Sequence, residues 1–168
     1  MLRPMIMQSI LDEDYPEYLY EGKMLLPPYV DRLDISIICS TTGLPEDFMS
    51  ANVHWLDWPV ISRHQVLSED FIDRFSELVY WPHISICQLL SEDFIHKYRH
   101  RICWENVSIH QVLGDQFIRE HKELVDWYYI SGHWTLSESF IEQHADDVDW
   151  DMVARYQILS EPFIESHS

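Results

Sequence analysis

The sequence has few glycines and few cysteines, and each shortage excludes a class of site. Four glycines in 168 residues argue against a glycine-rich loop that cradles phosphate. The three cysteines, Cys39, Cys87 and Cys103, are odd in number and scattered, which indicates free thiols in a reducing compartment. No apolar run approaches the ~18 residues of a membrane-spanning helix, and residues 1–7 are too short for a secretory signal. We expect an intracellular protein that is not secreted.

Positive charge is also scarce. The chain has 11 Lys and Arg against 29 Asp and Glu, a formal net charge of −18. Such a surface repels phosphate backbones, so we expect no direct binding of nucleic acid. Hydrophobic residues nevertheless make up 46% of the chain and aromatic residues 14%, which excludes disorder throughout. The composition therefore predicts an acidic globular protein.

Tryptophan recurs every 23 residues, and its neighbours recur with it. We number positions by their distance after this tryptophan, which is position 0 of each repeat. In repeats two to six, position 3 is Ile or Val, position 4 Ser or Ala, position 9 Leu, position 13 Phe and position 14 Ile. Position 0 holds, in chain order, Ile35, Trp58, Trp81, Trp104, Trp127 and Trp150. Six repeats thus fill residues 34–168, while residues 1–33 form an extension that either caps the array or serves as a docking tail.

Each repeat reads as two short helices. An aspartate before the tryptophan (Asp57, Asp126, Asp149) can cap the first helix. A serine at position 10 followed by glutamate can cap the second, with the apolar residues before and after it forming a hydrophobic staple. Helices this short are unstable alone, so each hairpin must bury its apolar side against its neighbours. The sequence therefore predicts an all-α fold, an α-solenoid of about six short helix-turn-helix repeats.

The sequence contains no motif for catalysis or for a cofactor. An acidic residue does recur at position 11, and it is found in every repeat: Glu46, Glu69, Glu92, Asp115, Glu138 and Glu161. Recurrence in every repeat indicates a structural role in helix capping and not one active site. We therefore expect a protein that is not an enzyme and that needs no cofactor.

Histidine and glutamine occupy further columns. Histidines recur at position 6 (His64, His110, His133) and position 17 (His121, His144, His167), and glutamines at position 7 (Gln65, Gln88, Gln111, Gln157). Layers ~9 Å apart hold equivalent atoms too far apart to share an ion at bonds of ~2 Å. We expect each imidazole to serve its own hairpin or a contact between layers, with metal binding by a cross-column His pair and Cys87 as the alternative. We expect the glutamines to satisfy backbone groups in the turn between helices, with recognition of a partner's backbone as the alternative.

The variable positions of the two helices differ in charge. Four of fifteen variable positions on the first helices are charged, against twelve of nineteen on the second helices. Apolar and aromatic residues at exposed, variable positions are typical of a binding surface. The first-helix residues therefore predicted to bind a protein partner are Val60, His83, Ile86, Ile109, Tyr128, Tyr129, Met152 and Arg155. The alternative is that these side chains pack against the adjacent hairpin.

One basic cluster interrupts the acidic chain. Lys97, Arg99 and Arg101 lie close together in the third repeat. They predict a docking patch for an acidic partner or for a second copy of this chain, and the alternative is a solvated helix face.

The pattern W-x2-I-S-x2-Q-x-L-S-E-x-F-I has its cleanest copy between Trp81 and Ile95. It resembles tandem repeats of proteins from large DNA viruses and large phages, and the resemblance covers residues 34–168. It implies a viral origin, and with it a virion as an alternative to the cytoplasm. Repeat one lacks the tryptophan, and Trp134 replaces the glutamine of repeat five.

Three functions remain open from the sequence. The first is a protein–protein scaffold or adaptor that uses the first-helix face. The second is a structural virion or assembly protein that associates with itself or with capsid and assembly proteins through its ends. The third is an acidic decoy that mimics nucleic acid.

Overall fold

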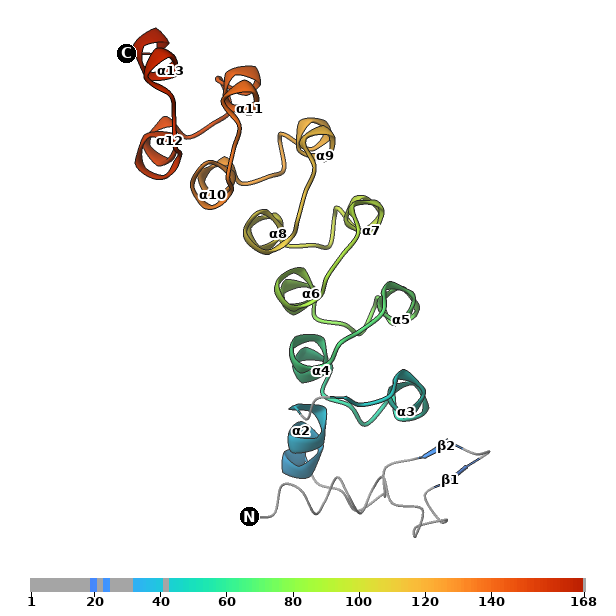
Figure 1. Cartoon of the computed structure of the whole chain (residues 1–168). Helices are drawn as coiled ribbons and strands as arrows, with labels where there is room; N and C mark the ends of the chain where they lie inside the picture. Colours follow the sequence, from blue (N-terminus) through green and yellow to red (C-terminus); the bar gives the residue numbers. More distant parts are fainter. Residues whose placement is uncertain (1–18, 21–22, 25–31, 41–42, 168) are drawn as a thin grey trace. The chain divides into compact units, whose positions relative to one another are not determined.

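The computed structural model describes residues 19–20, 23–24, 32–40 and 43–167, and these residues form twelve helices and one short ladder (Figure 1). The first helices of the repeats are α2 (Arg32–Ser40), α4 (Trp58–His64), α6 (Trp81–Cys87), α8 (Trp104–His110), α10 (Trp127–His133) and α12 (Trp150–Tyr156). The second helices are α3 (Glu46–Ala51), α5 (Glu69–Arg74), α7 (Glu92–Lys97), α9 (Asp115–Glu120), α11 (Glu138–Gln143) and α13 (Glu161–Ser166). Each pair is one hairpin, so the predicted all-α solenoid of six hairpins is confirmed.

Only part of the N-terminal extension is described. β1 (Leu19–Tyr20) and β2 (Lys23–Met24) form a two-residue antiparallel ladder, and β2 lies near α3. The first helix begins at Arg32, slightly before the expected repeat boundary at residue 34. The choice between a cap and a docking tail depends mainly on residues outside the described range, so that prediction stays open.

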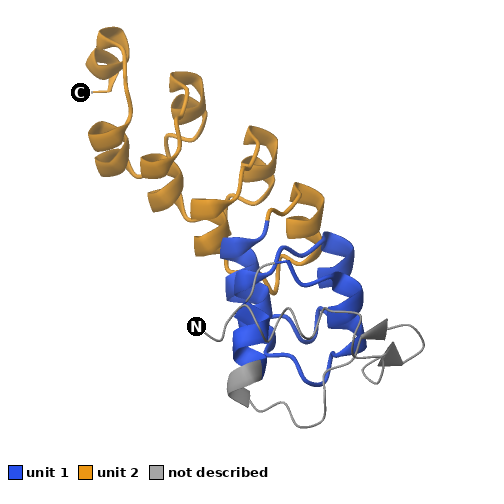
Figure 2. Cartoon of the chain, turned by 60° about the horizontal axis from the view of Figure 1, so that its bottom comes forward, with its two compact units in different colours: residues 1–88 blue, residues 89–168 orange. Residues whose placement is uncertain are grey.

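Residues 1–88 and residues 89–168 form two compact units, and each is described by itself (Figure 2). In the N-terminal unit α2 packs on α4 and α4 packs on α6. In the C-terminal unit α8 packs on α10 and α10 packs on α12. The first helices therefore stack side by side within each unit.

The helices begin at the predicted capping residues. The Asp57 carboxylate accepts a hydrogen bond from the Val60 N–H at the start of α4, and Asp126 and Asp149 cap α10 and α12 in the same way. The serine hydroxyls at position 10 accept from the phenylalanine N–H three residues later in α5, α7, α11 and α13. These second helices have six residues each, so a cap satisfies a large share of their free amides.

The position 0 tryptophan bonds the segment that precedes its helix and packs its ring within its own hairpin. Its Nε1 donates to the carbonyl five residues earlier in all five tryptophan repeats, at 2.9 to 3.1 Å. The ring lies near the position 13 phenylalanine and the ring at position 17. In the fourth repeat, His121 stacks on Phe117 at 4.2 Å between centroids and faces Trp104 at 5.4 Å.

The serine at position 4 joins successive repeats. The Ser62 hydroxyl donates to the Trp58 carbonyl at 2.7 Å and accepts from the Tyr80 N–H of the next repeat at 2.9 Å. In the first repeat Cys39 takes this position, and its Sγ accepts from the Asp57 N–H at 3.4 Å. Burial raises the pKa of the Cys39 thiol. The cysteine is therefore part of the packing between repeats.

The glutamine at position 7 makes a second link to the preceding repeat. Gln88 Oε1 accepts from the Leu67 N–H at 2.9 Å, while its Nε2 donates to the carbonyls of Gln65 at 2.7 Å and Ser62 at 3.1 Å. Gln157 repeats this pattern in the C-terminal unit. The prediction that these glutamines satisfy backbone groups is confirmed, and the groups belong to the previous repeat. Trp134, which replaces the glutamine, donates to the Ser108 carbonyl at 2.9 Å.

The acidic residue at position 11 makes a third link. The Glu46 carboxylate accepts from the Ser68 N–H at 2.7 Å, and the Glu138 carboxylate accepts from the Ser160 N–H. Each carboxylate therefore binds the N-cap serine of the next second helix. The predicted structural role of this column is confirmed, and it lies between repeats.

Candidate partner-binding surface

In repeats two, three, four and six, the turn between the two helices exposes an apolar side chain at position 8. The position 8 residues Val66, Leu89, Val112 and Ile158 are 92%, 90%, 88% and 98% exposed, and Thr135 is the fifth member. The position 6 residues at the ends of α4, α6, α8, α10 and α12 are also exposed. In the C-terminal unit we call these residues the turn strip: Leu89, Val112, Thr135, Ile158, His110, His133 and Tyr156.

The turn strip carries no negative charge. Segments 61–68, 84–91, 107–114, 130–137 and 153–160 contain none of the 29 acidic residues of the chain. An apolar, charge-depleted row on an otherwise acidic protein is the composition expected at the centre of a protein interface. Sequence reasoning missed it, because position 8 lies in the turn and outside the helix positions whose charge was compared. The absence of acids from these segments was the available signal.

The predicted partner-binding residues differ in accessibility according to their position in the repeat. Position 2 side chains reach back to the preceding repeat: His83 Nδ1 lies 2.9 Å from the Pro59 carbonyl, and the Tyr129 hydroxyl donates to Glu105 at 3.3 Å. Partial desolvation and the Glu105 carboxylate raise the pKa of Tyr129. For these two residues the alternative of packing against the adjacent hairpin holds, and like Val60 they are half-buried.

Met152 is a correction to the predicted surface. Only 4% of its area is exposed, because its side chain fills the space left by a glycine on the preceding first helix. A Cβ added to Gly132 would lie 2.3 Å from Met152 Cε. Met152 therefore belongs to the packing between α10 and α12 and is not available to a partner.

The remaining predicted residues stay accessible. Tyr128, Ile86 and Arg155 are exposed, while Ile109 is half-buried. Tyr128 packs edge-on against Tyr129, with ring centroids 5.3 Å apart, and Tyr129 meets His133 of the turn strip at 5.5 Å. In the C-terminal unit, Tyr128 thus extends the turn strip along α10.

The predicted basic patch lies on α7 and the turn after it. Lys97 and Arg101 are exposed and Arg99 is half-buried. Arg99 donates to the His96 carbonyl at 3.1 Å, and Lys97 Nζ lies 5.3 Å from the centroid of the Tyr98 ring. These local contacts fit the solvated helix face, and the docking role stays a prediction.

The histidines at position 17 pack within their own hairpins, and His121 also makes a contact between layers, as predicted. His121 Nδ1 lies 3.0 Å from the Phe117 carbonyl, which makes it the donor, and its Nε2 lies 3.0 Å from His96 Nδ1. His144 differs, because its buried Nε2 has no hydrogen-bond partner. Across the described ranges, no three His, Cys, Asp or Glu side chains are grouped to hold a metal ion.

The glutamine column offers no recognition surface. Gln65, Gln88 and Gln111 are buried, and their amides bond the preceding repeat. The alternative that they recognise a partner's backbone is therefore wrong.

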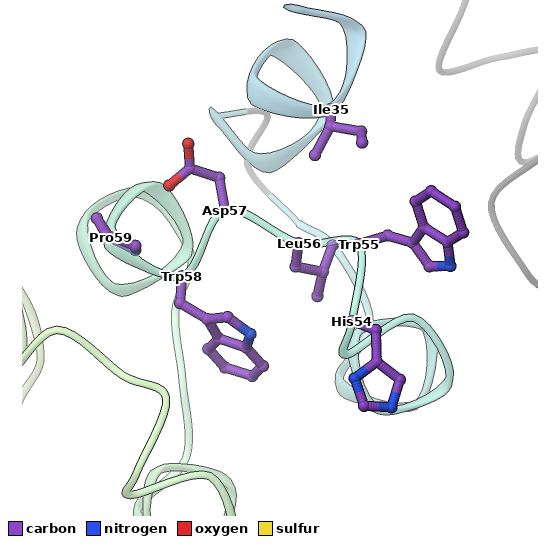
Figure 3. Close-up of a pocket in the computed structure, with 7 residues that line it drawn as sticks. All are labelled: Ile35, His54, Trp55, Leu56, Asp57, Trp58 and Pro59. Atoms are coloured by element: carbon purple, nitrogen blue, oxygen red, sulfur yellow. The ribbon is translucent and has the colours of Figure 1, made fainter. Parts of the chain in front are cut away.

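A hollow of about 640 Å³ lies beside the start of α4 (Figure 3). His54, Trp55 and Leu56 line it from the turn after α3, and Ile35 faces it from α2. Two polar groups at its wall already have partners, because the Asp57 carboxylate caps α4 and the Trp58 Nε1 donates to the Val53 carbonyl. Nothing in this hollow identifies a ligand.

We compared the chain with protein-family models, curated proteins and solved structures, and none of them matches. The described residues contain no helix long and apolar enough to cross a membrane. The class of protein is therefore assigned from the sequence and structure of the chain. It is an acidic α-solenoid of short hairpins with exposed apolar side chains in its turns.

Proposed function

We propose that the protein is a non-catalytic scaffold or adaptor that binds a protein partner along the turn strip. The observation that carries the proposal is the exposure of Leu89, Val112 and Ile158 at 88% or more, in segments that contain no acidic residue. Burial of such exposed apolar side chains by a partner stabilises the complex, by about 25 cal/mol for each Å² of apolar surface covered. The acidic residues on either side favour a partner that is neutral or basic around its apolar centre.

The repeated architecture supports a binding role. In the turn strip, repeats three, four and six each contribute one exposed apolar turn residue (Leu89, Val112 and Ile158), so an elongated partner can meet several repeats at once. Such additive contact is the usual mode of helical repeat proteins. A viral origin, which the repeat resemblance implies, would make a host or a virion protein the partner.

A pair of triple variants tests the proposal. The strip variant carries Leu89→Ser, Val112→Ser and Ile158→Ser. The control variant carries Glu142→Ser, Gln143→Ser and Glu165→Ser, which are exposed residues of second helices in the same unit. Because all six side chains are exposed, both variants should keep the far-ultraviolet circular dichroism and the unfolding midpoint of the parent.

Capture from the native source, quantified by mass spectrometry, then compares the variants. We expect a discrete partner that the parent and the control variant retain and the strip variant loses. A partner retained by the strip variant and lost by the control would place binding on the second helices and refute the proposal. Capture of a basic nucleic-acid enzyme that salt releases from both variants would favour the decoy function instead.

The assembly function keeps one supporting observation. The α12–α13 hairpin has an open apolar face, where Trp150 and Ile164 are both exposed. Particles or assembly proteins captured equally by the parent and the strip variant would favour this second function.

A further inference from the structure

In the C-terminal unit, the hairpin before α12–α13 has one face that the next hairpin covers. The outer face of the α12–α13 hairpin is the equivalent face. Ile141, at position 14 of the preceding hairpin, is fully buried, whereas Ile164 at the same position is 51% exposed. Beside Ile164 lies a groove of about 470 Å³, lined mainly by apolar groups that include Trp150, Val153, Leu159 and Phe163. The groove therefore continues an interface that the array already uses.

The interface between hairpins five and six shows what this groove can bind. There the Leu136 N–H donates to Gln157 Oε1 at 3.0 Å, and Gln157 Nε2 donates to the carbonyls of Ser131 at 2.8 Å and Trp134 at 2.7 Å. The Glu138 carboxylate accepts from the Ser160 N–H. The equivalent groups on the last hairpin are the Leu159 N–H, the carbonyls of Ala154 and Gln157, and the Glu161 carboxylate.

We propose that this face docks a helical hairpin of the same repeat type, carried by another chain, that presents a glutamine at position 7. The glutamine would bind the Leu159 N–H and the two carbonyls, and the incoming apolar side would cover Ile164. Ala154 lacks the serine hydroxyl of position 4, so that one link is absent. A second copy of this chain is not the expected occupant, because position 7 of its first repeat is Thr42.

The residue at position 5 of the last hairpin indicates which hairpin sequence would fit the groove. Arg155 stands there, as Arg63 stands at position 5 of α4. Within the N-terminal unit, α6 packs on α4 and contributes Gln88 and His83 to their hydrogen bonds. Hairpin six would fit poorly, because its Met152 fills the space beside a glycine at position 5. A hairpin with the sequence of residues 80–98 is therefore the matching probe.

The first experiment measures binding of a fluorescein-labelled peptide of residues 80–98 to the full chain by anisotropy. We expect saturable binding that Gln88→Ala in the peptide weakens at least about tenfold, because a glutamine with three hydrogen bonds contributes more than the 1.4 kcal/mol that a factor of ten represents. Ile164→Glu in the chain should abolish binding. Val112→Glu is the matched control at an exposed turn residue away from this groove, and it should leave peptide affinity unchanged.

The second experiment separates a poor face from a peptide that folds too weakly. Residues 77–98 are appended after Ser168, which places the new tryptophan 23 residues after Trp150. We expect a higher unfolding midpoint, and a smaller rise when the appended glutamine is alanine. No rise would refute the proposal, and so would an equal rise when the appended glutamine is alanine. Ile158 lines this groove as well as belonging to the turn strip, so Leu89→Ser and Val112→Ser alone, without Ile158→Ser, separate the two proposals.

Discussion

Two buried histidines at the same position of neighbouring repeats should respond in opposite ways to the same substitution. His121 and His144 both stand at position 17 of their repeats. Each lies beside the tryptophan ring and the phenylalanine ring of its own hairpin. Position 17 of the second repeat is Phe75, whose centroid lies 5.3 Å from Trp58 and 4.7 Å from Phe71. The hairpin therefore accommodates a phenyl ring here, and the substitution in both cases is His→Phe.

The expected signs follow from the hydrogen bonds. His144 Nε2 is buried without a partner, and its Nδ1 lies 3.5 Å from Asp147, too far for a strong hydrogen bond. Removing an unsatisfied buried polar atom should stabilise the fold by about 1–2 kcal/mol. His121 uses both ring nitrogens, toward Phe117 and His96, so His121→Phe should destabilise it by about 1–3 kcal/mol.

Urea unfolding at pH 8, followed by circular dichroism, measures both changes. The parent and the two variants should share one m-value, which shows that the same surface is exposed on unfolding. Shifts of the same sign in both variants, or no gain for His144→Phe, would refute the assignment of the unsatisfied nitrogen.

Three further predictions concern the contacts between repeats and the free thiols. Gln88→Ala should lower the free energy of unfolding by about 2–4 kcal/mol and speed amide hydrogen exchange at Leu67, whereas a loss below about 0.5 kcal/mol would mean that this glutamine does not join repeats. Gly132→Ala and Met152→Ala should be coupled by about 0.5–3 kcal/mol in a double-mutant cycle measured by urea unfolding, because each change alters the same contact. Additive effects on the free energy of unfolding would contradict this contact. A thiol reagent at pH 8 should modify the exposed Cys87 in the native protein and Cys39 only after unfolding, because Cys39 is buried and its thiol pKa is raised. Equal rates of modification at Cys87 and Cys39 in the native protein would contradict the burial of Cys39.

Much of the fold could be predicted because its signals are local. Asp57 and Ser68 cap helices through amides three residues away, and a 23-residue period places equivalent residues in equivalent environments. The structural role of His121 was predictable for the same reason. The stacking of hairpins followed from helices too short to stand alone.

The partners of the linking side chains were not predictable from local sequence. Gln157 bonds residues 21, 23 and 26 positions earlier, and those pairings require the stacking geometry. Met152 was misplaced because its burial depends on Gly132 in another repeat. The exposure of Val112 was missed because position 8 lies in the turn and outside the helix positions whose charge was compared, and only the turn geometry directs this side chain outward.

Site-specific photo-crosslinking tests the central claim most directly. A photoreactive phenylalanine analogue replaces Val112 in one chain and Gln143, which is also exposed, in another. Both proteins are irradiated with the native extract. The account predicts one partner protein crosslinked from position 112 and absent from position 143. Crosslinking of the partner from position 143, with none from position 112, would place recognition on the second helices and contradict a turn-strip interface.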